Sequence, residues 1–216
     1  MPGHLLGDRR EDVIRLVLGL AVFVVAALLV KQGLAPGEKA TFVAINSLPD
    51  WLYVVIWPFM QYGVFLTIPV LSIIALVMRR VRLAITMAIA GVGVYLLARV
   101  IKEIARRGRP EALIDSVEAR ETFAAGSLGF PSGHAAVAAA LTVVVTPHLH
   151  GRWRILPAAL LVIVCIGRMY VGAHTPLDLI GGAALGASAG YAARLLTGAS
   201  ARPVARSADP SRESRR

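Results

Sequence analysis

Six apolar segments, separated by cationic stretches, constrain this chain more than any other feature of its sequence. They lie at about 12–31, 57–78, 83–101, 134–150, 155–171 and 177–197. A helix needs about 20 apolar residues to cross a bilayer, and the fourth and fifth segments are short by that measure. Only 17% of the 216 residues are charged, and the mean hydropathy is +0.67. A soluble domain has more charge than this, so the pattern predicts an all-α bundle of six transmembrane helices.

The positive charges indicate how such a bundle would lie in the phospholipid bilayer. The formal net charge is +10, aromatic residues make up only 6%, and the cations sit between apolar segments. We therefore expect anionic lipid, and no nucleic acid, to face them. With six spans, the arginines at 9–15, 79–82, 152–154 and 194 share one side. The positive-inside rule then predicts an integral, multi-pass protein of the plasma (inner) membrane with both termini in the cytoplasm.

The last segment and the tail differ in composition. Gly182, Gly186 and Gly190 form two overlapping small-xxx-small units, which are typical of close helix packing. Residues 199–216 are rich in Arg, Ser and Pro and have no apolar period. We expect a transmembrane domain over residues 1–198. The tail would be disordered, or a linker to a fused or associated membrane domain.

Three polar clusters interrupt the apolar pattern, and six spans would place all of them at the external ends of the helices. The first is "KEIARRGRP", the second "FPSGHAA" and the third "GRMYVGAHTPLD". Each has a purely structural interpretation: Lys102 could snorkel, Ser132 could be an N-cap, and Thr175 to Asp178 has capping-box spacing. Cationic and histidine clusters that gather at one membrane face are better explained by a functional site.

The residue types in these clusters suit phosphate chemistry. Lys102, Arg109 and Arg168 supply positive charge, and guanidinium groups match phosphate oxygens in pairs. At an effective dielectric near 20, a cation about 4 Å away contributes roughly 4 kcal/mol of attraction before desolvation. Ser132 and Gly133 open a helix, whose N–H groups and dipole favour an anion.

Two histidines complete the set. One of His134 and His174 can attack phosphorus while the other protonates the leaving oxygen. Asp178 follows His174 by four residues, so it can lie on the same face and hold the imidazole in its attacking tautomer.

The three clusters resemble the three-part signature of the type 2 phosphatidic acid phosphatase superfamily. The matching patterns are Lys102-x6-Arg109-Pro110, Pro131-Ser132-Gly133-His134 and Arg168-x5-His174-x3-Asp178, and the resemblance covers about residues 50–197. The superfamily includes lipid phosphate phosphatases, bacterial polyprenyl diphosphate phosphatases and vanadium haloperoxidases. One departure is Gly167, where the third motif often has serine before its arginine.

The resemblance implies a role for each of these residues. His174 would be the nucleophile that forms a phosphohistidine, Asp178 its orienting partner and His134 the general acid. The phosphoryl group would be bound by Lys102, Arg109, Ser132, Gly133 and Arg168. The resemblance also implies a phosphatase without a metal or other cofactor.

Two further features concern the substrate. If the helix that carries Lys102 continues for another turn, Arg106 shares its face and could hold the second phosphate of a diphosphate. In that arrangement Arg107 would point about 100° away. The acidic residues in the loop between the first two clusters favour a solvated loop or substrate lid over metal binding. They are Glu111, Asp115, Glu118 and Glu121.

The sequence therefore predicts a membrane phosphatase for a lipid phosphate or diphosphate. A polyprenyl diphosphate is the first choice, and phosphatidate or phosphatidylglycerol phosphate the second. The membrane spans disfavour a halide-oxidising vanadate enzyme. A non-catalytic lipid-phosphate-binding or flippase-associated membrane module stays open as an alternative, and a phosphate-release assay would distinguish the two.

Overall fold

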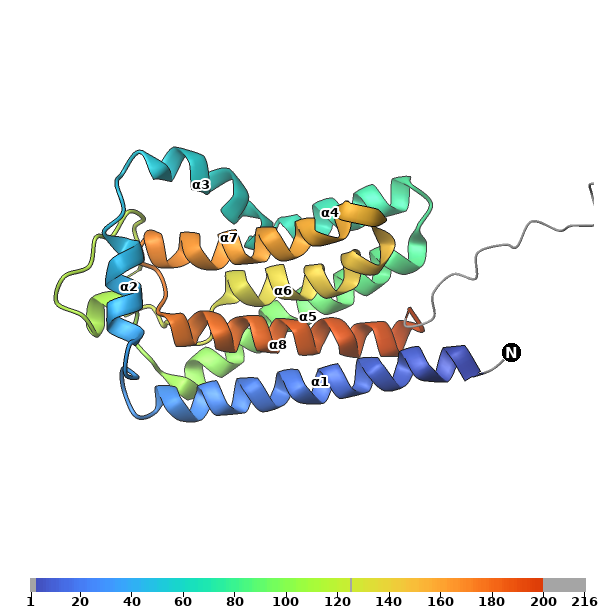
Figure 1. Ribbon diagram of the computed structural model, residues 1–216, viewed down its shortest axis with the longest axis horizontal. Coiled ribbons are helices and arrows are strands. Elements are labelled where there is room, and N and C mark those ends of the chain that lie inside the picture. The colour runs from blue at the N-terminus through green and yellow to red at the C-terminus, as the bar shows by residue number, and fades with distance from the viewer. Residues whose placement is uncertain (1–2, 125, 200–216) are drawn as a thin grey trace, which may run out of the picture.

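A computed structural model describes residues 3–124 and 126–199, and all regular elements in these ranges are helices (Figure 1). The predicted basic tail, except Ala199, lies outside the described residues. The helices, joined by turns and short 3₁₀ segments, are α1 (Gly3–Val30), α2 (Glu38–Asn46), α3 (Leu52–Met60), α4 (Thr67–Val77), α5 (Val81–Ala105), α6 (Gly133–Val145), α7 (Leu156–Tyr170) and α8 (Pro176–Thr197).

The chain is an integral membrane protein whose helices differ in length from the predicted spans. Within the described residues, four helical stretches are long and apolar enough to cross a membrane: Arg9–Val30, Val81–Ala105, Gly151–Tyr170 and Pro176–Thr197. The predicted span at 57–78 is instead two helical pieces, Leu52–Gly63 and Thr67–Val77, bent by 67° at their junction. Counted as one span, this pair adds a fifth, whereas Gly133–His148 is shorter than the usual span.

Helix α6 is short because it forms the centre of the bundle. Every residue from Ala135 to Leu141 is buried, and five of the seven are alanine. Helices α5, α7 and α8 surround it, and large apolar side chains on the outer helices are exposed, as a bilayer requires. A helix that is apolar on all sides is buried by its neighbours, and small side chains let those neighbours approach closely.

The glycines of α8 pack against α6, as the small-xxx-small pattern predicts. A Cβ on Gly186 would overlap the carbonyl oxygen of Ala136, and one on Gly182 would overlap that of Ser132. A Cβ on Gly190 would lie 2.8 Å from Cβ of Val143. The contacts of Gly186 and Gly182 are with backbone atoms, which cannot rotate away as a side chain can. The glycines therefore set how closely α8 approaches the start of α6.

The two ends of the bundle carry different groups. Figure 1 shows α2, the loop after α5, the start of α6 and the α7–α8 turn together at one end. The turns after α4 and α6, which carry Arg79, Arg80, Arg152 and Arg154, lie at the other end, where α1 begins and α8 ends. The three polar clusters thus share the end that lacks these arginine-rich turns.

Substitution of Gly186 by alanine should destabilise the protein, because the added Cβ meets the backbone of α6. Overpacking of this kind costs about 1–3 kcal/mol, which lowers the Tm of a protein this size by roughly 5 °C. Gly93→Ala in α5 is the matched control, since none of the described heavy atoms lies within 4 Å of a Cβ placed there. Thermal unfolding in detergent measures both, and equal Tm values would contradict the role of Gly186.

Candidate active site

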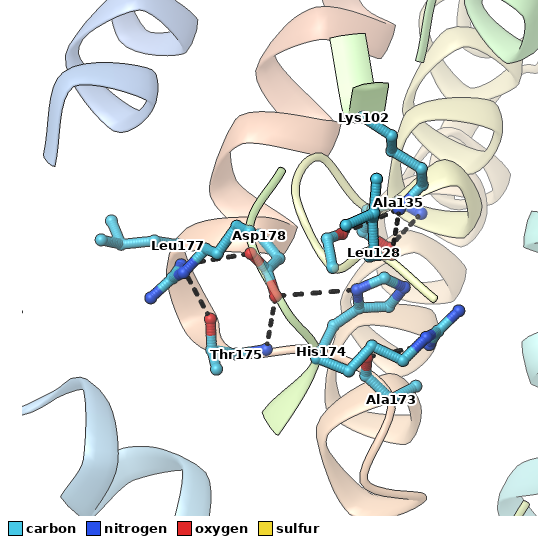
Figure 2. A network of polar contacts seen from close by, with 12 residues as sticks. Lys102, Leu128, Ala135, Ala173, His174, Thr175, Leu177 and Asp178 are labelled. Atoms are coloured by element: carbon cyan, nitrogen blue, oxygen red, sulfur yellow. Dashed lines mark hydrogen bonds and ion pairs between the residues drawn. The ribbon is translucent and has the colours of Figure 1, made fainter. Parts of the chain in front are cut away.

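The first cluster is placed by the end of α5. The Lys102 side chain does not snorkel away: its Nζ donates to the carbonyl oxygens of Leu128 (2.8 Å) and Gly129 (2.9 Å), as Figure 2 shows. The helix ends at Ala105, because Arg106 adopts a left-handed backbone conformation with φ 48°. Lys102 therefore ties the end of α5 to the loop that leads into α6.

The turn between α7 and α8 places the third cluster. The N–H groups of Ala173 and His174 both donate to the carbonyl oxygen of Arg168, at 3.0 and 3.2 Å. Gly172 has φ 80°, a conformation that a residue with a Cβ adopts only with strain. This tight turn holds the backbone of His174 against the last turn of α7.

Asp178 occupies the first turn of α8, and its side chain is fully buried. Its Oδ2 accepts the N–H of Thr175 at 3.0 Å and lies 3.7 Å from Nδ1 of His174 (Figure 2). The first contact is the carboxylate arm of the predicted capping box. The second is longer than a hydrogen bond, but it points the carboxylate at the imidazole. The capping role of Asp178 is confirmed, and its place beside His174 is compatible with the predicted orienting role.

The second cluster opens α6. Ser132 is the N-cap, and its Oγ accepts the N–H of Ala135 at 3.4 Å. The N–H groups of Gly133 and His134 lie in the first turn, where a helix offers them no internal acceptor. Among the described residues, no heavy atom lies within 4 Å of a Cβ built on Gly133, so this turn faces open space. Backbone N–H groups here can approach an anion closely.

Two guanidinium groups come from other elements: Arg109 from the loop after α5 and Arg168 from the last turn of α7. Arg109 donates from Nε to Ser127 Oγ (2.6 Å) and from Nη1 to the carbonyl oxygen of Ala173 (3.0 Å). Arg168 donates from Nη1 to Oε2 of Glu121 at 2.8 Å. The Phe123 ring lies 4.2 Å from the guanidinium carbon of Arg109 and 5.9 Å from that of Arg168. Burial, and then the charge of Arg168, lower the pKa of Arg109 below its usual value.

The loop after α5 is less solvated than its composition predicts. The Arg120 side chain is 9% exposed and donates to the carbonyl oxygens of Asn46, Leu48 and Tyr170. It thereby anchors the loop to the residues around α2 and α7. Glu121 then reaches the Arg168 side chain, so the loop covers part of the candidate site, as a lid does.

The imidazole of His174 is held neutral by its surroundings. It is buried, and burial lowers its pKa well below the usual value; the charges of Lys102, Arg168 and Arg109 lower this pKa further. The same three cations act electrostatically on His134. A neutral imidazole keeps a lone pair, which a nucleophile needs. Both histidines thus share one group of cations.

The sequence interpretation missed two buried residues, Arg107 and Glu38. Arg107 does not point away from the site: its Nη1 donates to Oδ1 of Asp178 at 3.1 Å. Glu38, at the start of α2, pairs with Arg107 at 2.9 Å. Helix α5 ends at Ala105, so the condition under which Arg106 would share the face of Lys102 is not met. Arg106 is exposed, and its Nε donates to the carbonyl oxygen of Glu103.

The helical membrane fold and this constellation define the class of protein. The family model of the PAP2 superfamily matches residues 79–202, more than half of the chain. The chain belongs to the PAP2 superfamily. No curated protein matches the sequence.

Two crystal structures have the same fold. That of Aquifex aeolicus LpxE is 22% identical, covers 72% of this chain and 93% of its own, and gives a TM-score of 0.66. The PAP2-type phosphatidylglycerolphosphate phosphatase from Bacillus subtilis is 22% identical, covers 87% of this chain and 98% of its own, and gives a TM-score of 0.69. The chain therefore has the fold of a membrane PAP2-type phosphatase.

The lowered pKa of His174 makes a testable prediction. Its imidazole should stay neutral as the pH falls through about 6.5, where an unperturbed histidine gains a proton. The unfolded chain then binds a proton that the folded chain does not, so the free energy of unfolding should decrease below that pH. NMR of ¹³C-histidine-labelled protein, with His174→Gln to assign the signal, measures this. A His174 signal that titrates near pH 6.5 would contradict the electrostatic picture.

Proposed function

We propose that the protein hydrolyses a lipid phosphate or diphosphate through a phosphohistidine intermediate. One observation carries the proposal: three cations, two imidazoles and a helix N-terminus converge at one end of the bundle. The proposed phosphoryl ligands are Lys102, Arg109, Ser132, Gly133 and Arg168. The proposed catalytic residues are His174, His134 and Asp178.

Binding would begin when the substrate's phosphoryl group replaces the Glu121 carboxylate at Arg168. Glu121 holds the Arg168 guanidinium through a carboxylate whose side chain is 24% exposed, so an incoming phosphoryl group can replace it. Arg109 and the first turn of α6 face the same space. Preorganised donors of this kind stabilise the charge that develops on the equatorial oxygens in the transition state.

The chemical step follows from the orientation of His174. Nδ1 lies 3.7 Å from Oδ2 of Asp178, and in the proposed mechanism it carries the proton while Nε2 keeps the lone pair. The Nε2–P bond forms as the bond between phosphorus and the leaving oxygen breaks, and His134 gives its proton to that oxygen. His134 then takes a proton from water as the water attacks phosphorus. The N–P bond breaks, inorganic phosphate leaves, and His174 is neutral again.

The membrane topology is also part of the proposal. The chain passes along the bundle as α1, the α3–α4 pair, α5, α6, α7 and α8, which supports six spans. The arginine-rich turns at the opposite end favour a cytoplasmic position for that end and for both termini. The site then faces the exterior or periplasm, and acyl chains enter from the bilayer.

Two classes of lipid substrate are proposed, a polyprenyl diphosphate and a glycerolipid monophosphate. The notion of a polyprenyl diphosphate comes from the resemblance to family members that act on such lipids. Similarity to the Bacillus subtilis phosphatase supports phosphatidylglycerol phosphate as the second choice. Phosphate release from a panel of lipid monophosphates and diphosphates distinguishes them. Absence of release from every lipid would favour the non-catalytic lipid-binding module.

Rapid-quench experiments with a radiolabelled substrate should distinguish the roles of the two histidines. His174→Ala should form no acid-labile phosphoenzyme with any substrate, because it lacks the nucleophile. His134→Ala should lose about 10²–10⁴-fold in turnover of a lipid phosphate, whose alkoxide leaves poorly without a proton. With p-nitrophenyl phosphate the His134 variant should recover part of its first step and accumulate phosphoenzyme.

The opposite pattern would reverse the assignment of the two histidines: phosphoenzyme in the His174 variant and none in the His134 variant. The same assay in EDTA tests the absence of a metal cofactor. Activity should persist, since cations and a helix N-terminus bind the phosphoryl group. Loss of turnover that magnesium restores would contradict the mechanism.

Arg106 tests the diphosphate proposal. Arg106→Ala should lower kcat/KM for a diphosphate about tenfold, the value of one charged hydrogen bond, and leave a monophosphate unaffected. Arg99→Ala is the matched control, because Arg99 is likewise an exposed arginine but lies within α5, before the end of the helix that carries the site. Equal effects of Arg106→Ala on both substrates would show that Arg106 does not contact the second phosphate.

A further inference from the structure

One buried guanidinium joins two carboxylates next to His174. Arg107 donates from Nη1 to Oδ1 of Asp178 (3.1 Å) and to Oγ1 of Thr175 (3.1 Å). It also donates to both oxygens of Glu38, from Nη1 at 3.2 Å and from Nη2 at 2.9 Å. All three charged side chains are 5% exposed or less. Arg107 therefore faces inward and cannot itself contact a substrate.

Glu38 brings a distant part of the chain to the catalytic end. It begins α2, 69 residues before Arg107 and outside the residues that the family model matches. Besides pairing with Arg107, its carboxylate accepts the N–H groups of Ala35 (3.0 Å) and Leu177 (3.1 Å). Leu177 is in the first turn of α8, where the helix leaves N–H groups without an internal acceptor. Glu38 thus holds the start of α8, on which Asp178 lies.

The contacts of this group favour the ionised form of Glu38. Burial raises the pKa of Glu38, but hydrogen bonds from Arg107, Thr175 and the N–H of Ala35 together hold it below the usual value. Glu38 is therefore an anion at neutral pH, and Arg107 divides its single positive charge between two carboxylates. Without the charge on Glu38, Arg107 would neutralise Asp178 more completely. The Oδ2 atom that faces His174 would then be a weaker partner for the imidazole.

We propose that Glu38 and Arg107 form a positioning pair for the phosphohistidine reaction. The pair fixes the Asp178 carboxylate against His174, and its arginine favours the ionised carboxylate while positive charge develops on the imidazole. Neither residue is a catalytic residue, since both act through Asp178. This inference rests on the proposed function of His174 and Asp178.

A purely structural ion pair is the competing explanation, and the chain provides a matched control for it. Asp12 of α1 pairs with Arg194 of α8 at 3.1 Å, and the Asp12 side chain is as buried as that of Glu38. That pair also ties the N-terminal part of the chain to α8. It lies at the opposite end of the bundle, far from the candidate site (Figure 1). A structural role predicts similar consequences for the two pairs, whereas a positioning role does not.

The experiment compares Glu38→Gln with Asp12→Asn in the full-length protein in detergent. Three quantities are measured: the Tm, the Ki of inorganic phosphate as a competitive inhibitor, and the single-turnover rate of phosphoenzyme formation. Both variants should lower the Tm, because Glu38→Gln removes one of the two carboxylates that pair with Arg107, and Asp12→Asn removes the carboxylate that pairs with Arg194. Only Glu38→Gln should slow phosphoenzyme formation, by about ten- to a hundredfold, as loss of an outer orienting partner does at metal sites. The phosphate Ki should stay at the wild-type value, because Lys102, Arg109 and Arg168 are intact.

Several outcomes would overturn the inference. One is a wild-type rate of phosphoenzyme formation in Glu38→Gln; another is an equal loss of rate in both variants. If Glu38→Gln no longer binds phosphate, Arg107→Lys decides, because it keeps the positive charge but lacks the paired Nη1 and Nη2 donors of the guanidinium. Arg107→Lys should also be slow at a normal phosphate Ki; if it too binds no phosphate, the pair only maintains the fold. Wild-type protein that hydrolyses no lipid phosphate would instead refute the proposed function.

Discussion

The buried carboxylate of Asp178 is the point at which the three polar clusters meet. A carboxylate with no solvent exposure must receive its hydrogen bonds from the protein, and here the partners come from different parts of the chain. Oδ2 takes the N–H of Thr175, Oδ1 takes Arg107, and the backbone carbonyl oxygen accepts the N–H of Ser132 at 2.9 Å. The need to satisfy one residue therefore fixes the start of α6 and the loop after α5 relative to His174.

These partners can reach Asp178 only because α6 and α8 approach each other very closely. The absence of a side chain at Gly182 lets the backbone of Ser132 lie against α8, which brings its N–H within reach of Asp178. Gly129 does the same for the loop, since a Cβ there would lie 3.0 Å from Oδ2 of Asp178. Helix packing through small residues is a general feature of membrane bundles. In this chain it also determines where the phosphoryl ligands lie.

The sequence predicted what depends on local spacing and missed what depends on distant contacts. Apolar runs predicted the helices, motif spacing predicted the three clusters, and the Gly186 pattern predicted close packing. The positions of Arg106 and Arg107 depend on where α5 ends, which the left-handed residue at its end decides. Glu38 carries no motif and acquires its role from a contact 69 residues away. The bend in the second span and the loop anchored by Arg120 likewise depend on tertiary packing.

The distribution of charge explains how a crowded catalytic end can bind an anion and still contain carboxylates. Arg107 is committed to Glu38 and Asp178, both inside the protein, so these two anions do not repel a substrate strongly. Lys102 and Arg109 donate to neutral carbonyl and hydroxyl oxygens rather than to carboxylates. Arg168 is paired with Glu121, the most exposed carboxylate of the group, which a phosphoryl group can replace. The carboxylates proposed to orient His174 thus pair with a different cation, Arg107, from those proposed to bind the phosphoryl group, and a positioning role for Glu38 is compatible with phosphate binding.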